Sequence, residues 1–477
     1  MKLVKSLKKI LSVFALILAI FPSFFPSSVG AQTLIEQLEK TALPAIQIPK
    51  IDRMKLDSGM RLLLQQNHEV PVVRGYIYIA TGEVYEPQDK LGVADLTGLM
   101  LRSGGTRTMS PQAFDEKLAS MGAEISSSMD RDYGIVAFKC LREDFPKVLA
   151  MVFEMLKEPS FDVQRLDLKK QQLMDALKRE NDDPADIAKR EFPKLVYGAD
   201  NVWGRSPTSG SIQALNREDV QSFYQQFYYP QRMVMALSGD FNIDQSKSQL
   251  NQLTRNWPKT LSELPTLQPM DQHWESGLYF IPKKIDQATI FVGHYGEKRF
   301  NPDKYALLLL NEILGGDTLT SRLGKKIRSS LGLAYAINSR YGLQNDYGIF
   351  FVAAQTEAKN TNRVLQEIRK QLEELLKPGN ISEAEMNYYK NSLLSSLYSQ
   401  YEPAYNFAKD EAKFDYYGYE PNYLELLREK LQAVTVADLQ RVAQKYIRPG
   451  VLKILVVGDA EKVGALPGAK ILEIEKD

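Results

Sequence analysis

The sequence is poor in the side chains that most often carry metal or redox chemistry, since 477 residues include one cysteine and three histidines. The single cysteine, Cys140, excludes an intramolecular disulfide. It lies in an apolar strand pattern with no histidine nearby to activate it, which favours a buried small hydrophobe over a nucleophile. No two of the histidines (His68, His273 and His294) stand four residues apart on one helix. The common helical zinc signature is therefore absent, and each histidine is expected to be structural.

An excess of charge of one sign is also missing. Lys and Arg number 60 and Asp and Glu 59, giving a net charge of +1, and no block of five or six like charges occurs. This balance argues against a nucleic-acid-binding protein and against a charged, solvated tail. Neither a Gly-x-Ser-x-Gly elbow nor a phosphate-binding loop is present. With 44% hydrophobic and 25% charged residues, the composition instead predicts a globular protein with a sizeable core.

Long apolar runs are absent except at the N-terminus. Residues 10–21 are apolar apart from one serine, follow four lysines, and end at Pro22, so the run is too short to span a bilayer. Small residues at 29–31 match a signal-peptidase site, and we predict a signal peptide over residues 1–31. The mature chain is then expected in the periplasm or an equivalent compartment outside the cytoplasm. An uncleaved anchor that keeps the protein membrane-associated is the alternative.

An internal repeat is the most informative feature that is present. Residues 216–241 align with residues 435–460 without a gap, at an offset of 219. Each copy begins with a helix cap, Asn216 or Thr435, and has an acidic residue three positions later. A helical pattern, a proline, an apolar strand and a Gly-Asp turn follow in both copies. The sequence therefore predicts two copies of one domain.

The upstream patterns repeat in the same order. A strand pair is expected from residues 54–66 and 72–80, and further strand pairs are expected within residues 123–141 and 333–354. Strands are also expected near residues 278–282 and 288–295. Helices are expected near residues 90–101, 111–121, 144–156, 163–180, 303–314, 318–330, 360–376 and 383–398. The predicted fold class is α+β, with two homologous domains that each pack helices on a mostly antiparallel sheet. We place them at residues 50–260 and 272–465, joined by a proline-containing stretch, with a ligand cleft expected between them.

Two motifs connect these halves to a known family. Residues 92–100, GVADLTGLM, stand where the inverted zinc peptidases have G-x-A-H-x-x-E-H-M. Residues 321–323 and 327–335, SRL and IRSSLGLAY, are similar to that family's S-x-L and L-R-E-x-x-G-L-A-Y. The chain resembles pitrilysin, insulin-degrading enzyme, mitochondrial processing peptidase and their bacterial relatives from about Met54 to Asp459. The resemblance implies a duplicated α+β unit in a clamshell arrangement.

The chain departs from this family at the zinc site. The first histidine is replaced by Asp95, the catalytic glutamate by Gly98 and the second histidine by Leu99. The position of the third ligand falls near Ala176. Zinc catalysis needs about three protein ligands, an open position and a base, which these residues do not supply. We therefore expect this chain to bind no metal and to be inactive on its own.

The second half keeps two residues that have roles in the family. The resemblance implies that Arg328 and Tyr335 bind the substrate backbone and stabilise the tetrahedral intermediate, as fixed donors toward developing negative charge. By spacing alone, an arginine at a helix end and a tyrosine in a strand are ordinary surface and core residues. Residues 315–318, Gly-Gly-Asp-Thr, are similar to a glycine-rich loop with which relatives handle substrate.

Some members of the family work as pairs, and this sequence resembles the partner without the zinc motif. The leading hypothesis is a non-catalytic subunit of a heterodimeric zinc endopeptidase. Its partner carries H-x-x-E-H and the zinc, and peptides or unfolded segments are the substrates. The alternative is a peptidase-like binding or scaffold subunit with no role in proteolysis. A self-sufficient metallopeptidase with a rearranged site is the remaining possibility.

Overall fold

The computed structural model describes residues 49–258, 263–267, 270, 272, 274–401 and 403–474. The predicted signal peptide and His273 lie outside these residues. Within the described ranges, no helix is both long enough and apolar enough to cross a membrane.

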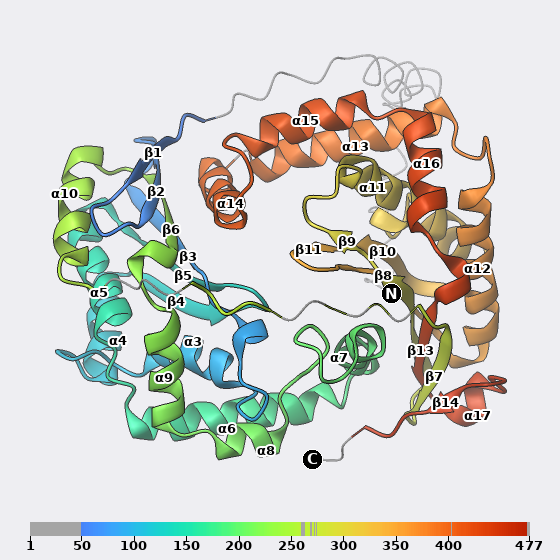
Figure 1. Cartoon of the computed structure of the whole chain (residues 1–477), viewed down its shortest axis with the longest axis horizontal. Helices are drawn as coiled ribbons and strands as arrows, with labels where there is room; N and C mark the ends of the chain where they lie inside the picture. Colours follow the sequence, from blue (N-terminus) through green and yellow to red (C-terminus); the bar gives the residue numbers. More distant parts are fainter. Residues whose placement is uncertain are drawn as a thin grey trace, which may run out of the picture. The chain divides into compact units, whose positions relative to one another are not determined.

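Each half of the chain forms a six-stranded sheet (Figure 1). The first has the order β1-β2-β6-β3-β5-β4, with β1 (Asp52–Lys55), β2 (Arg61–Gln66), β3 (Val72–Ile79), β4 (Glu124–Met129), β5 (Gly134–Leu141) and β6 (Met233–Gly239). The second has the order β14-β7-β13-β8-β12-β10, with β7 (Gly277–Pro282), β8 (Gln287–Tyr295), β10 (Ala334–Tyr341), β12 (Ile349–Glu357), β13 (Lys453–Gly458) and β14 (Lys470–Ile471). Two short strands, β9 (Glu297–Lys298) and β11 (Leu343–Gln344), pair separately.

The two sheets repeat one another strand for strand. In both, the strand that follows the repeated helix is parallel to one neighbour and antiparallel to the other: β6 between β2 and β3, and β13 between β7 and β8. The remaining inner pairs are antiparallel. The sheets differ at one edge only, since β1 is antiparallel to β2 whereas β14 is parallel to β7. The predicted α+β class with two mostly antiparallel sheets is confirmed.

The helices of the first half are α3 (Val93–Ser103), α4 (Pro111–Ser120), α5 (Phe145–Lys157), α6 (Val163–Glu180), α7 (Pro184–Tyr197), α8 (Ser209–Ala214), α9 (Arg217–Phe227) and α10 (Ile243–Thr254). Those of the second half are α11 (Lys304–Asn311), α12 (Thr361–Leu376), α13 (Glu383–Tyr401), α14 (Ala404–Tyr417), α15 (Tyr423–Ala433), α16 (Val436–Tyr446) and α17 (Ala460–Val463). Two π-helices, η4 (Glu312–Gly316) and η5 (Gly324–Ser330), follow α11.

The repeated helices α9 and α16 begin with the capping boxes that the sequence predicts. The Asn216 side chain accepts from the Asp219 N–H, and the Asp219 carboxylate accepts from the Asn216 N–H, at 3.0 and 2.9 Å. Thr435 and Asp438 make the same two contacts at 3.2 and 3.1 Å. Each box satisfies two N–H groups that a helix start leaves unpaired.

Three expectations about the elements are wrong. The predicted strand over 54–66 is a hairpin, because Gly59 adopts a φ of 93° and the Leu56 N–H donates to Met60 O. β2 also does not pair with β3, since β6 from the end of the half lies between them. In the second half, residues 318–320 form a turn and the helix begins at Arg322, because the Asp317 carboxylate accepts from the N–H groups of Leu319 and Thr320.

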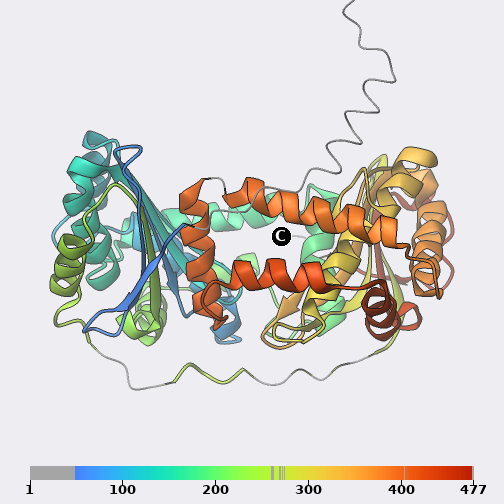
Figure 2. The ribbon, with the colours of Figure 1, turned by 90° about the horizontal axis from the view of Figure 1, so that it is seen from above.

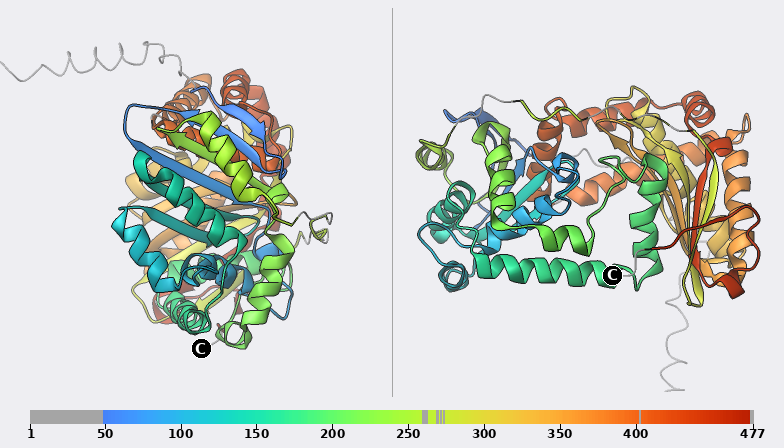
Figure 3. Two further views of the ribbon diagram at one scale, coloured as in Figure 1. Left: turned by 90° about the vertical axis from the view of Figure 1, so that its left-hand side faces the viewer. Right: turned by 60° about the horizontal axis from the view of Figure 1, so that its bottom comes forward.

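Each half also receives one helix from the other half. The helix α14 packs against the first sheet, where Ala408 and Ala412 contact Leu63, Tyr78 and Ala236 (Figure 2). The helix α7 packs against the second sheet (Figure 3, right). Its cluster joins apolar residues of α7 to strand residues, namely Ile187, Phe192, Val196, Phe291, Tyr295, Leu455 and Val457. At the repeat offset of 219, α7 and α14 are equivalent helices, so the exchange is reciprocal.

Candidate functional site

The start of α3 carries the substituted zinc motif and is held by a buried glutamate. Gly92 caps the helix with a φ of 95°. The Glu86 carboxylate accepts from the N–H groups of Gly92 and Ala94, at 3.0 and 2.8 Å. Burial raises the pKa of Glu86 to about 8, against the lowering effect of these two hydrogen bonds. The sequence shows no signal for this role, because Glu86 precedes the helix by several residues.

A buried arginine fixes the segment that leads into α3. Arg205 is 7% exposed and donates to the backbone carbonyls of Glu83 and Glu86 and to the Gln88 side chain. Burial lowers the pKa of Arg205, while the negative charge of Glu86 raises it. A guanidinium that spans several carbonyls makes a rigid brace, because its donors point in fixed directions. The segment before α3 is thus fixed by a residue that is 117 to 122 positions away from the groups it contacts.

The structure brings two of the four substituted positions together in one pocket. Asp95 of α3 and Ala176 of α6 line a pocket of about 460 Å³, together with Glu83, Arg131 and Glu180. Gly98 is buried against β4, where an added Cβ would lie 3.4 Å from the backbone of Ser128 and Met129. Leu99 is partly buried and is not part of the pocket lining. Sequence reasoning missed Glu83, Arg131 and Glu180, although Glu180 lies one helical turn after Ala176.

The charges in this pocket are mixed. Burial, followed by the charge of Glu83, raises the pKa of Asp95 to about 7, while Arg131 lowers it. Arg131 Nε lies 3.1 Å from Glu83 Oε2, and Arg131 also donates to Arg205 O at 2.9 Å. Asp95 is therefore a carboxyl group that changes its charge near neutral pH.

The pocket does not fit a catalytic zinc ion. Asp95 is the one metal-binding side chain at a family ligand position, since leucine and alanine have no donor atom. Across the part of the chain that the structure describes, no group of three or more His, Cys, Asp or Glu side chains could hold a metal ion.

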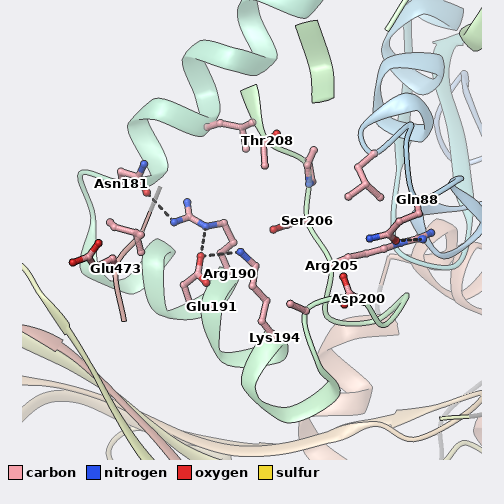
Figure 4. A pocket seen from close by; sticks show the side chains of 15 residues that line it. Gln88, Asn181, Arg190, Glu191, Lys194, Asp200, Arg205, Ser206, Thr208 and Glu473 are labelled. Carbon is pink, nitrogen blue, oxygen red and sulfur yellow. Dashed lines mark hydrogen bonds and ion pairs between the residues drawn. The ribbon is translucent and has the colours of Figure 1, made fainter. Parts of the chain in front are cut away.

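A second pocket adjoins the first and shares four lining residues with it, among them Arg190 and Ser206. It has a volume of about 390 Å³ and is shown in Figure 4. The side chains of Arg190 and Lys194 both contact Glu191, at 2.8 and 3.0 Å. Its lining has three cationic side chains, Arg190, Lys194 and Arg205, and an equal number of carboxylates from Glu191, Asp200 and Glu473, so the pocket offers polar contacts but little net charge.

In the second half, Tyr335 occupies an irregular position of the sheet. The pairing of β10 with β12 shifts between Ala334 and Ala336, so Tyr335 is the extra residue of a β-bulge. Its side chain is 52% exposed, and its hydroxyl donates to Glu357 Oε1 at 3.3 Å. A bulge redirects a side chain out of the regular alternation, and such irregularities are frequent beside functional sites.

Arg328 lies on η5, a π-helix, and is partly exposed. The glycine-rich segment 315–318 ends the other π-helix, η4. An added Cβ at Gly315 would lie 2.5 Å from Ser339 Oγ, so the segment needs glycine there to approach β10. Asp317 accepts from Leu319 and Thr320, which together with the charge of Arg328 lowers the pKa of Asp317. Single π-helical turns are rare and occur often at functional sites.

The two described histidines and the cysteine have the environments expected of structural residues. His294 is buried, with Nδ1 2.6 Å from Tyr295 O and Nε2 accepting from the Arg448 N–H, and burial lowers the pKa of His294 to about 4. The exposed His68 contacts Asp240 at 2.5 Å. Cys140 is buried, and burial raises the pKa of its thiol to about 12.

Two family models match the chain. The model described as Insulinase (Peptidase family M16) matches residues 61–202, and the model described as Peptidase M16 inactive domain matches residues 214–393. The chain belongs to peptidase family M16. The resemblance to the inverted zinc peptidases is confirmed, and the substituted ligands make the chain an inactive M16-like homologue.

The individual relatives share less than a quarter of their aligned residues with this chain. The uncharacterized zinc protease YmxG of Bacillus subtilis is 24% identical over 351 residues, covering 73% of this chain and 83% of that protein. The non-peptidase homolog YmxG of Helicobacter pylori is 22% identical over 406 residues, covering 84% and 92%. The beta subunit of the mitochondrial-processing peptidase of Dictyostelium discoideum is 22% identical over 426 residues, covering 84% and 87%.

The fold has solved counterparts. The crystal structure of a peptidase M16 inactive domain from Pseudomonas fluorescens superposes with a TM-score of 0.77 at 21% identity, covering 86% of this chain and 98% of that chain. A protease from Helicobacter pylori gives a TM-score of 0.77 at 18% identity, covering 86% and 100%. These structures support the fold of two helix-covered sheets.

Proposed function

We propose that this chain is the non-catalytic subunit of a heterodimeric zinc endopeptidase outside the cytoplasm. A second M16 chain with an intact H-x-x-E-H motif brings the metal. This chain supplies half of the substrate chamber and donates Arg328 and Tyr335 to the partner's active site. The substrates are peptides or unfolded protein segments.

The position of Tyr335 carries the proposal. A tyrosine within a regular antiparallel strand usually lies on one face of the sheet, packed by its cross-strand neighbours. Here the β-bulge leaves Tyr335 outside the regular pairing and half exposed, and its phenol donates at 3.3 Å to the partly exposed Glu357 carboxylate, a bond that a substrate oxyanion would replace. Arg328 lies on the adjacent π-helix and provides a permanent positive charge. Together they offer the two donors that a developing oxyanion needs.

The missing zinc ligands of the first half support the same assignment. Asp95, Gly98, Leu99 and Ala176 leave the chain without a ligand set or a general base. A pair of donors for a tetrahedral intermediate has a chemical purpose only where a metal and a base are present. The name of one relative, a subunit of the mitochondrial-processing peptidase, is consistent with a multi-subunit enzyme.

The test is to purify the chain alone and together with an H-x-x-E-H chain, and to measure cleavage of an unstructured peptide and zinc content. We expect cleavage by the pair only. Arg328→Ala or Tyr335→Phe is expected to lower kcat/KM by roughly 100-fold, the loss typical of removing one oxyanion donor.

Two matched variants control for nonspecific effects. Arg340→Ala removes another exposed arginine of the same half, and Tyr388→Phe removes the hydroxyl of another half-exposed tyrosine. Both are expected to leave the activity of the pair unchanged. A pair that is active but insensitive to the Arg328 and Tyr335 variants would support the scaffold alternative, and cleavage by the lone chain would overturn the proposal.

A further inference from the structure

A third pocket lies on the second half and has a strongly positive lining. It has a volume of about 530 Å³ and lies between η5 and α12. Among the described residues that line it, Arg322 and three lysines stand against one carboxylate, that of Glu374; the lysines are Lys325, Lys326 and Lys370. The chain as a whole is nearly neutral, so this concentration of one sign is a local feature.

Some of these charges are compensated by residues outside the lining. The carboxylate of Glu374 is neutralised by Lys377, at 2.5 Å. The guanidinium of Arg322 makes a two-pronged contact with Glu385, at 2.8 and 2.6 Å. It also contacts Asn380, which lines the pocket too. Arg322 is therefore a fixed part of the wall rather than a free cation.

The lysines are not compensated in this way. Lys325 lies over the rings of Tyr388 and Tyr389, at 5.4 and 5.6 Å, and aromatic faces leave its charge unneutralised. Within the described ranges, neither Lys326 nor Lys370 has a carboxylate at ion-pair distance, although the pKa of Glu374 is lowered by Lys377 and, from farther away, by the charge of Lys370. Three ammonium groups around one groove repel each other, and an anion between them removes that repulsion.

We propose that this groove binds a phosphate-class oxyanion. Lysine ammonium groups are compact point charges with rotatable donors, which suits the several acceptor oxygens of a tetrahedral anion. Ser330 and Asn380 add a hydroxyl and an amide to the same groove. The groove is larger than a bare phosphate requires, which favours a phosphate ester. The ester comes either from a free metabolite or from the headgroup of an anionic lipid.

The experiment measures binding to the purified full chain by calorimetry at low and at physiological salt. The probes are inorganic tripolyphosphate, vesicles of phosphatidylglycerol, and vesicles of phosphatidylcholine as the neutral control. We expect binding of tripolyphosphate that weakens with salt, because exposed ion pairs are screened. The double variant Lys326→Gln/Lys370→Gln is expected to lose about tenfold in affinity, and Lys326→Glu/Lys370→Glu more.

Charge-matched control variants distinguish the groove from general electrostatics. Lys117→Glu/Lys247→Glu makes the same charge change on exposed helix positions of the first half and is expected to bind like the unmodified chain. Binding of phosphatidylglycerol vesicles through the same two lysines supports the lipid source, and tripolyphosphate binding alone supports the soluble one. The proposal is overturned if no phosphate probe binds, if the control weakens binding equally, or if only an acidic peptide binds.

Discussion

Arg299 and Asp132 form a buried ion pair between the two halves of the chain, with Arg299 Nη2 3.1 Å from Asp132 Oδ2. Their side chains are 6% and 12% exposed. The Arg299 guanidinium lies 3.4 Å from the ring centre of Tyr417, whose hydroxyl donates to Asp132 at 3.0 Å. The pair thus joins the β4–β5 turn of the first half to the exchanged helix α14 and the second half.

Removing one partner of this ion pair is expected to destabilise the folded chain. Asp132→Ala leaves a buried guanidinium without its counter-ion and should lower the free energy of unfolding by about 3 kcal/mol. The joint replacement Arg299→Met/Asp132→Leu should recover part of that loss, because no charge is then buried. Urea unfolding measures both. The control is Asp286→Asn at the exposed pair Lys462–Asp286, where we expect a change within about 0.5 kcal/mol.

The pKa of Asp95 predicts a pH-dependent stability. Its value of about 7 in the folded chain lies above that of an unfolded aspartate, about 3.9, so folding favours the protonated form. The stabilisation that protonated Asp95 gives to the folded chain is therefore present at low pH and is lost as the pH rises from about 4 to 7. Asp95→Asn should be more stable than the unmodified chain at pH 8, by on the order of 2 kcal/mol, and equal to it near pH 4. A constant difference across this range in chemical unfolding would contradict the assignment.

The helix exchange can be tested at Phe192 of α7. Phe192 is buried and contacts Phe291 and Phe351 of the second sheet, with ring centres 5.4 and 6.5 Å apart. Phe192→Ala should lower the free energy of unfolding by about 3–5 kcal/mol and expose the segment around α7 to proteolysis. Leu168→Ala on α6, where the residue is 45% exposed, is the control and should have little effect. An equally small effect of both would mean that α7 does not pack on the second sheet.

The close approach of Gly315 to β10 predicts the effect of adding a single methyl group. An alanine Cβ there would lie 2.5 and 2.6 Å from Ser339 Oγ and N. Gly315→Ala should therefore lower stability by about 1–3 kcal/mol, since the backbone must shift. Thermal unfolding is the measurement, with Gly450→Ala as a control, because an added Cβ at Gly450 meets no atom within 4 Å. If the two variants unfold at the same temperature, the segment is less constrained than the contact implies.

Local patterns predicted many of the elements. The helix α4 begins at Pro111 with Ser110 as its cap, and α6 spans Val163–Glu180 as the periodicity indicates. These signals come from residues within one or two turns, where caps and apolar spacing act. The spacing of Ser382 and Glu385 predicts a capping box at the start of α13, but only half of it forms. Ser382 Oγ accepts from the Glu385 N–H, while the Glu385 carboxylate binds Arg322. Arg322, which is distant in the sequence, thus binds the Glu385 carboxylate that the local pattern predicts to cap the helix.

The sequence by itself determined the duplication, the family and the loss of the zinc ligands, because each of these is recognised from residue types and their spacing alone. Tertiary structure decided the rest. It exchanged α7 and α14 between the sheets, placed Glu83 and Arg131 beside Asp95, and put Tyr335 on a bulge. These features depend on contacts between separate segments of the chain, which for Leu63 and Ala408 are 408 − 63 = 345 residues apart. Such contacts are fixed by the packing and charge of both partners together, and neither segment specifies them alone.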